Sequence, residues 1–229
     1  MYIYLDTETT GTDDEDYLCQ LAYKTNKDHA VNELFKPPIP IKIGAMAVHH
    51  ITNKAVENKP AFSGSPVKTQ LQALLDDPRN ILVAHNAPFD IGKLQKEGVN
   101  VPRFICTLKL IKAMDKEGLL ESHKLQYLRY YYDMGIDVQA HDAWGDVLVL
   151  EQLFIIFFKE FQKSYDSPQK IQEEMFRITQ NPVLVPKISF GKHKGTYFKD
   201  LPKDYLQWLV KQNDMDEDVL YTVKHYLKA

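Results

Sequence analysis

The chain has 229 residues, of which 44% are hydrophobic and 26% charged, and its formal net charge is −3. This is the composition of an ordinary globular protein, and it excludes fibrous and disordered chains. Two cysteines, Cys19 and Cys106, are too few for a disulfide framework and lack the CxxC metal spacing. Asp6 stands where a signal peptide needs apolar residues, and the longest apolar run, residues 153–158, is too short to cross a bilayer. We expect a cytoplasmic protein without a membrane partner.

The N-terminal part of the chain has the pattern of β-strands. Residues 2–5, 18–25 and 30–35 are rich in apolar and aromatic side chains, and short polar stretches separate them. This spacing predicts an antiparallel meander. A helix-like segment at 67–75 precedes the apolar run 80–85, which predicts a buried fourth strand.

Helical spacing of apolar residues dominates the middle of the chain, over residues 107–116, 124–134 and 144–162. A strand meander followed by alternating strands and helices predicts an α/β fold, with a mixed sheet flanked by helices.

The C-terminal part changes character. Residues 166–186 contain three prolines and predict a linker with a short helix. Residues 187–229 hold eight lysines against six acids and predict a small basic α+β module. These boundaries leave residues 1–165 as the main domain.

Within this module, helices are expected at 204–211 and 218–227, and Tyr205 and Trp208 are expected to fill its core. The segment Gly191-Lys-His-Lys-Gly195 lacks the spacing of a phosphate-binding P-loop. It predicts either a tight hairpin turn with solvated lysines or a turn whose Lys192 and Lys194 contact phosphates.

Two acids end the first predicted strand, within the string LDTETTG at residues 5–11. Because side chains alternate along a strand, Asp6 and Glu8 point to the same side. Two adjacent carboxylates repel, and a divalent cation would neutralise them. An Asp-x-Glu pair alone is usually a solvated strand end, so the longer string carries the prediction of a metal site.

Two further strings supply acids and a base. Asp90 ends the string HNAPFD after the fourth predicted strand, and Pro88 suits a first helical turn. Asp90 could bind metal or simply stabilise the helix dipole. His141 precedes Asp146 by five positions at the start of an apolar helix, so both can face one point. A histidine beside a metal-binding carboxylate suits a general base, since histidine titrates near pH 6.5.

These three strings resemble, in order and content, the motifs of the DEDDh (DnaQ-like) 3′ to 5′ exonucleases. The spacing from His141 to Asp146 is typical of the histidine branch. Residues 48–52 resemble the family's V-H-G-I-T segment, with His50 in place of glycine, and residues 106–108 its D-T-L segment. The resemblance implies an RNase H-like fold over about residues 1–161. Residues 187–229 are similar to the small C-terminal module of exonuclease X-like proteins.

The resemblance implies a two-metal hydrolase, with two Mg²⁺ or Mn²⁺ ions as cofactors. Asp6, Glu8, Asp90 and Asp146 would bind these ions, and His141 would deprotonate the attacking water. The substrate-binding residues would be Thr7, Thr9, Thr10, His49, Ile51 and Phe89.

Removal of nucleoside 5′-monophosphates from DNA 3′ ends, in repair or proofreading, is the function that the resemblance favours. An exoribonuclease and a non-catalytic partner-binding module on the same fold remain alternatives. Nucleic acid is the expected partner, and a homodimer is left open.

Overall fold

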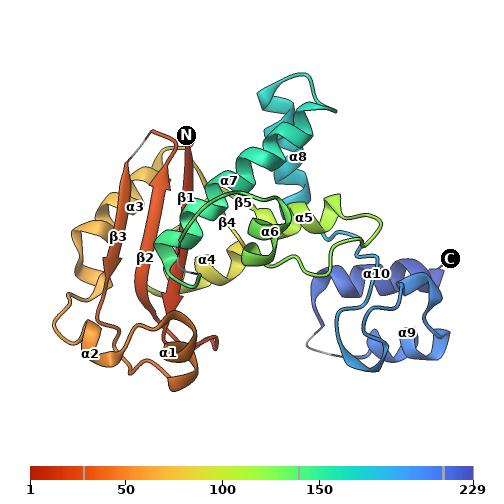
Figure 1. The fold of residues 1–229 in the computed structure, drawn as a ribbon, viewed down its shortest axis with the longest axis horizontal. Coiled ribbons are helices and arrows are strands. Elements are labelled where there is room, and N and C mark those ends of the chain that lie inside the picture. Colours follow the sequence, from red (N-terminus) through yellow and green to blue (C-terminus); the bar gives the residue numbers. More distant parts are fainter. Residues whose placement is uncertain (28, 139, 213–214, 229) are drawn as a thin grey trace. The chain divides into compact units, whose positions relative to one another are not determined.

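In this computed structural model, residues 1–27, 29–138, 140–212 and 215–228 are described. The first part of the chain contains a five-stranded sheet of order β3-β2-β1-β4-β5 (Figure 1). The strands are β1 (Tyr2–Thr9), β2 (Leu18–Thr25), β3 (Ala30–Leu34), β4 (Ile81–Ala84) and β5 (Phe104–Cys106). The first three pair antiparallel, whereas β1, β4 and β5 run parallel. The predicted meander and mixed α/β fold are confirmed.

Helix α7 (Ala143–Gln162) covers the face of the sheet toward which the even-numbered residues of β1 point. Tyr2 and Tyr4 contact Phe154 of this helix, with ring centroids 4.7 and 5.7 Å away. Asp6 and Glu8 continue the same alternation and so lie on the same face. Asp146, two turns before Phe154, therefore lies near the end of β1.

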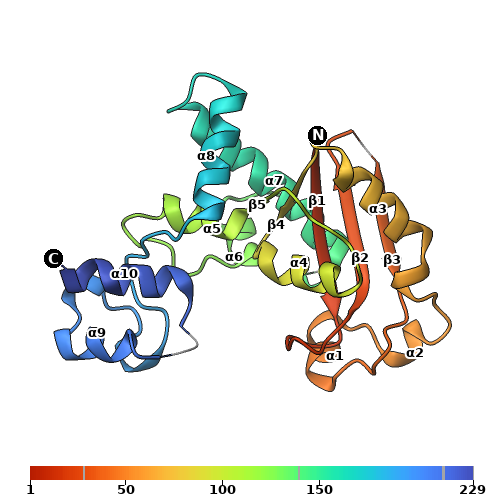
Figure 2. The ribbon, with the colours of Figure 1, turned by 180° about the vertical axis from the view of Figure 1, so that it is seen from behind.

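The opposite face of the sheet carries α3 (Pro66–Asp76) and α4 (Ala87–Lys96), as Figures 1 and 2 show. Helix α4 begins directly after β4, and Pro88 occupies its first turn. Two short helices connect β3 to α3, namely α1 (Ile43–His49) and α2 (Asn53–Val56). Helix α6 (Leu125–Tyr131) packs on α7.

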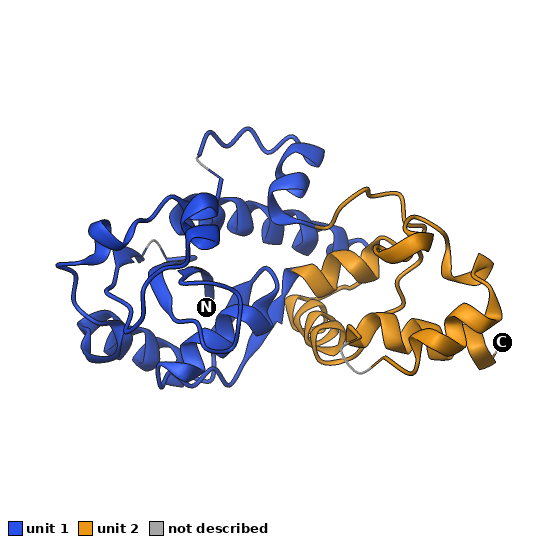
Figure 3. Ribbon diagram, turned by 90° about the horizontal axis from the view of Figure 1, so that it is seen from below, with its two compact units in different colours: residues 1–107, 124–164 blue, residues 108–123, 165–229 orange. Residues whose placement is uncertain are grey.

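Two compact units make up the structure (Figure 3). Residues 1–107 and 124–164 form the first, and residues 108–123 and 165–229 form the second. The division into 1–165, 166–186 and 187–229 remains a prediction. Most of α5 (Thr107–Met114) groups with the C-terminal unit, although β5, directly before it, belongs to the sheet.

The C-terminal unit is mostly helical, with α8 (Pro168–Gln180), α9 (Lys203–Leu209) and α10 (Glu217–Lys228). Its core joins eight buried residues: Val185, Ile188, Phe198, Leu201, Leu206, Leu209, Val219 and Val223. In the described residues after 186, β structure is limited to the bridge between Lys187 and Tyr197, less than the α+β expectation. The segment between them closes as the predicted hairpin, since Gly195 N donates to Ile188 O at 2.7 Å.

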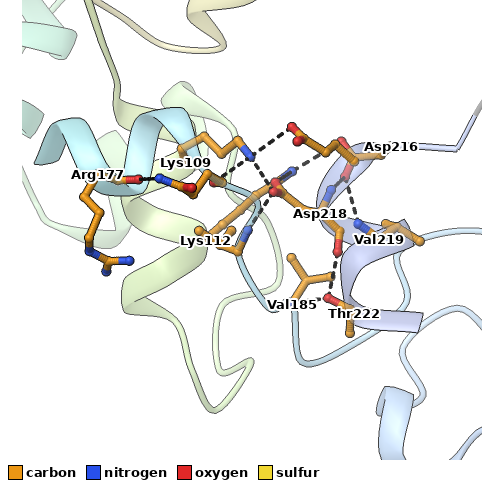
Figure 4. A network of polar contacts seen from close by, with 11 residues as sticks. Lys109, Lys112, Arg177, Val185, Asp216, Asp218, Val219 and Thr222 are labelled. Carbon is orange, nitrogen blue, oxygen red and sulfur yellow. Dashed lines mark hydrogen bonds and ion pairs between the residues drawn. The ribbon is translucent and has the colours of Figure 1, made fainter. Parts of the chain in front are cut away.

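A buried carboxylate connects two distant parts of this unit (Figure 4). Asp218 of α10 is 2% exposed and accepts from Lys109 at 2.5 Å and Lys112 at 2.8 Å, both in α5. The backbone N–H of Val183 donates to the same carboxylate at 3.0 Å. These donors hold the pKa of Asp218 below its usual range despite its burial, which acts in the opposite direction.

None of the helices in the described part of the chain combines the length and the apolar character that crossing a bilayer requires.

Candidate active site

Three carboxylates converge where the end of β1 meets the start of α7. One oxygen each from Asp6, Glu8 and Asp146 lies within 4.8 Å of the others. Asp6 and Glu8 come from alternate positions of β1, and Asp146 lies in the first turn of α7. The predicted convergence of these three side chains is therefore present in the structure.

Asp90 lies beside this cluster, in the first turn of α4, and is buried. Its Oδ1 accepts from the Thr7 backbone N–H at 3.1 Å and from the Thr7 hydroxyl at 2.7 Å. These two bonds fix the carboxylate against the central strand. Asp90 is not among the residues whose oxygens lie within 4.8 Å of one another. Among the neighbouring charges, however, that of Asp90 raises the pKa of Asp6 the most.

Burial and mutual repulsion raise the pKa of all four carboxyl groups. The pKa of Asp6 lies well above its usual range because of burial and then of Asp90, Asp146 and Glu8. Burial, followed by the charges of Asp146, Asp90 and Asp142, raises the pKa of Glu8 to about 8. Burial raises the pKa of Asp90 to about 7, against the opposing bonds from Thr7. Such a site holds protons or cations rather than bare negative charge.

The metal-free protein should therefore lose stability as the pH rises. Folded carboxyl groups with raised pKa values keep protons that the unfolded chain releases above about pH 4. The free energy of unfolding should fall between pH 5 and 8, the latter near the pKa of Glu8, by on the order of 3 kcal/mol. Urea denaturation in EDTA measures this slope. Adding Mg²⁺ should remove most of it, and a slope that Mg²⁺ leaves unchanged would contradict the assignment of a cation site.

His141 lies in the loop directly before α7, as the sequence predicts, and its side chain is exposed. Its backbone has a φ of 59°, in the left-handed region that is uncommon for residues other than glycine. Strained backbone of this kind gathers at functional sites. Burial raises the pKa of Asp146, and the electrostatic effect of His141 lowers it. The two side chains therefore interact.

Two glutamines that the sequence analysis missed order the start of α7. Gln126 of α6 donates to the Asp146 carboxylate. Gln20 of β2 donates at 2.9 Å to Asp142, which caps α7 by accepting from Gly145 N. No motif marks these residues, because their role depends on the packing of α6 and β2 against α7.

The side chains of the predicted substrate-binding threonines are engaged within the chain. Thr7 donates to Asp90, and the Thr9 hydroxyl donates to Gly11 O at 2.6 Å. The Thr10 hydroxyl donates to Asp16 at 2.8 Å. Substrate contacts from this segment remain a prediction, and its side chains already shape the turn after β1.

His49 is buried, and both its ring nitrogens are used. Nε2 lies 3.1 Å from Thr9 O, and Nδ1 accepts from the Ile51 N–H at 3.0 Å, so Nε2 carries the proton. Burial lowers the pKa of His49. This neutral ring ties the loop after α1 to the end of β1. His50 has a φ of 62°, which explains why glycine suits this position in the family pattern.

The predicted contacts of Ile51 and Phe89 with substrate remain predictions. Both side chains are partly buried. Phe89 lies in the first turn of α4, with Lys93 Nζ 5.4 Å from its ring centre. Lys192 and Lys194 are exposed in the C-terminal unit, and their phosphate contacts also remain predictions.

Lysines clamp the acidic loop that follows β1. Lys42 pairs with Asp13 and Asp16, each at 2.7 Å. Buried Lys93 donates to Asp13 O, and Lys96 donates to Asp14 O at 2.7 Å. The loop is thereby fixed next to the carboxylate cluster.

A mixed sheet with three carboxylates converging at the end of its central strand, and a fourth beside them, is typical of metal-dependent phosphodiester hydrolases. The family model described as exonuclease, RNase T, matches residues 3–154. The chain belongs to this family, the DnaQ-like 3′ to 5′ exonucleases. A second model, described as a quorum-sensing-regulated virulence factor, matches residues 180–216.

Relatives agree with this membership, and a solved structure shares the fold. Exodeoxyribonuclease 10 of Escherichia coli (strain K12) is 28% identical over 216 residues, covering 86% of this chain and 84% of the relative. DNA polymerase III subunit epsilon of Buchnera aphidicola is 33% identical over 90% of this chain and 94% of the relative. The solved structure of exonuclease X in complex with 5′ overhanging duplex DNA shares the fold. Its TM-score is 0.60 at 23% identity, over 78% of this chain and 99% of that one.

The donor set fits divalent cations. This family uses divalent metals, and the cluster of Asp6, Glu8 and Asp146 offers only carboxylate oxygens. Hard oxygen ligands suit Mg²⁺ and Mn²⁺.

Proposed function

We propose that this chain is a two-metal exonuclease that removes nucleoside 5′-monophosphates from the 3′ ends of DNA. The convergence of Asp6, Glu8 and Asp146 at the end of β1 carries the proposal. DNA is the proposed substrate because the names of Exodeoxyribonuclease 10 and DNA polymerase III subunit epsilon refer to DNA. With DNA as the substrate, the proposed role is in repair or proofreading.

Two Mg²⁺ or Mn²⁺ ions bound here would stabilise charge on the attacking and leaving oxygens. Asp6, Glu8 and Asp146 would hold one ion, and Asp6 and Asp90 would contribute to holding the other. Thr7 keeps Asp90 in place through its two hydrogen bonds.

His141 accepts the proton of the attacking water. The water oxygen bonds to the terminal phosphorus, and the bond from phosphorus to the 3′ oxygen of the preceding nucleotide breaks. That oxygen takes a proton and becomes the new 3′ hydroxyl. The exposed position of His141 leaves its ring accessible to this water. Turnover should therefore rise from acid toward mildly alkaline pH, and a flat single-turnover profile from pH 6 to 8.5 would contradict the role of His141.

A substrate panel tests the proposal. Labelled single-stranded DNA, recessed duplex DNA and single-stranded RNA are incubated with the full chain in Mg²⁺ and in EDTA. Release of 5′-monophosphates from DNA in Mg²⁺ alone is expected. Preferred cleavage of RNA would show that RNA, and not DNA, is the substrate. Cleavage that EDTA leaves unaffected would contradict the metal site, and an inert chain that still binds DNA would favour a non-catalytic module.

Gln126→Ala should weaken metal binding without removing a metal ligand. Gln126 orients the Asp146 carboxylate through a hydrogen bond, and loss of such outer contacts typically costs about 10- to 100-fold in metal affinity or activity. The Mg²⁺ concentration for half-maximal turnover should rise, with much of the activity restored at saturating Mg²⁺. Gln152→Ala, an exposed change on α7, is the matched control. An unchanged Mg²⁺ requirement in Gln126→Ala would exclude the positioning role.

A further inference from the structure

One surface of the C-terminal unit combines aromatic rings with positive charge. Tyr205 and Trp208 stack on α9, with ring centroids 5.4 Å apart and 23° between their planes. The His193 ring lies 4.4 Å from the Tyr205 ring, and Lys192 Nζ lies 5.4 Å from its centre. We call these four residues the α9 face.

The α9 face is directed outward. Leu206 and Leu209 occupy the core side of α9, whereas Trp208 is 51% exposed and Tyr205 is half-buried against the core. The expectation that Trp208 fills the core is therefore wrong, because Leu206 and Leu209 already fill the inward positions of this short helix. Tyr205 and Trp208 lie three positions apart, so they are neighbours on the same side. A large ring left in water is available to a ligand.

The turn that begins at Gly191 holds Lys192 against the Tyr205 ring. Gly191 has a φ of 66°, and a Cβ there would lie 3.2 Å from the Tyr205 hydroxyl. Only glycine combines that backbone with such a close approach without strain. The turn therefore sets Lys192 and His193 against Tyr205 without help from a ligand.

The lysine against the Tyr205 ring favours an anionic ligand. The last 43 residues carry eight lysines and six acids; Lys194, Lys203 and Lys211 are exposed like Lys192, and Asp204 is the acid of α9. Cationic ligands are disfavoured beside Lys192. An acidic peptide would match the charge but would leave the stacked rings without flat partners. A single nucleic-acid strand supplies both phosphates and flat bases.

We propose that the α9 face binds single-stranded nucleic acid, with one base stacked on Trp208 and a phosphate contacting Lys192. The choice of this ligand rests on the proposed exonuclease function. Stacking and charge contact read no base identity, so DNA and RNA strands share the chemistry.

Binding is measured on the full chain in EDTA, where the proposed hydrolysis stops. The probes are dye-labelled oligothymidylate and oligouridylate of about 20 nucleotides, followed by fluorescence anisotropy. Trp208→Ala should raise Kd about 10-fold, and Trp208→Phe should stay near the wild-type value. Lys192→Ala should lower the slope of log affinity against log salt by about 0.7.

The matched controls are Tyr221→Ala and Lys224→Ala, an exposed aromatic and an exposed lysine on α10. Both should bind like the wild type. Wild-type affinity in Trp208→Ala would overturn the proposal, and so would an equal loss in Tyr221→Ala, which would show general damage to the unit.

Hydrolysis of a thymidine dinucleotide in Mg²⁺ separates this proposal from the exonuclease proposal. A dinucleotide bound at the carboxylate cluster has no further nucleotide to stack on Trp208, so Trp208→Ala should cleave it at the wild-type rate. A wild-type chain that cleaves nothing, yet loses affinity on Trp208→Ala, would contradict the proposed exonuclease and support the α9 face. Lost dinucleotide cleavage in Trp208→Ala would count against the α9 face.

Discussion

Replacing Asp6 by asparagine should lower turnover about 10²- to 10³-fold, because this side chain is the one that both proposed ions share. One of its oxygens lies within 4.8 Å of an oxygen of Glu8 and of an oxygen of Asp146. Initial rates on a 3′-labelled strand in saturating Mg²⁺ measure the loss. Residual activity above about 5% would contradict the metal assignment.

The same substitution should leave the metal-free fold intact or make it more stable. Asparagine keeps the shape of the side chain and cannot ionise, so it avoids the repulsion from Asp90, Asp146 and Glu8 that ionisation of Asp6 would bring. In EDTA at pH 8, Tm should equal or exceed the wild-type value. Asp14→Asn, an exposed change in the loop after β1, is the control and should keep full activity. A large fall in Tm for Asp6→Asn would show that lost activity reflects unfolding.

Asp218→Ala should destabilise the C-terminal unit by about 3–5 kcal/mol, the usual result of breaking a buried ion pair. The change leaves Lys109 and Lys112, which are 16% and 17% exposed, without their shared carboxylate. It also leaves the Val183 N–H without its acceptor. Trp208 lies in this unit and Trp144 in the other, so urea unfolding in a Trp144→Phe background reports on the C-terminal unit.

Glu217→Ala is the matched control for Asp218→Ala. Glu217 is 71% exposed and lies 3.7 Å from Lys109, so its removal should cost about 1 kcal/mol or less. The pKa of Asp218 is lowered, so its stabilisation is present above about pH 4 and is lost as the pH falls through the lower folded pKa. The difference in free energy of unfolding between wild type and Asp218→Ala should therefore become smaller at acid pH. Equal stability at pH 7 would contradict the role of the buried carboxylate.

Local patterns predicted the first four strands and the shared side of Asp6 and Glu8, whereas the inclusion of Asp146 in one site followed from the family resemblance. Alternation along β1 places Asp6 and Glu8 on one side, and Asp146 occupies the predicted first turn of the apolar helix. Some short elements, among them α1 and α2, were not predicted, because segments of four to seven residues show too little periodicity. β5, with three residues, showed only through its resemblance to a family segment.

Residues whose roles arise from tertiary contacts could not be found from the sequence. Gln126 matters because α6 packs on α7, and buried Lys93 because α4 passes the loop after β1. Their neighbours in the chain give no sign of these contacts. Asp218 looked like an ordinary acid in the first turn of a helix, and its partners lie more than 100 positions earlier.

That separation also bears on how the tail can be inherited. Suppose that a gene fusion appended only the C-terminal segment to an older exonuclease domain. Asp218 would then meet a helix α5 that had not been selected to carry Lys109 and Lys112. The two stretches are therefore expected to vary together among homologues, with the lysines accompanying the acid. Chimeras should follow the same rule: exchanging tails between related exonucleases should give folded proteins only when α5 is exchanged with them.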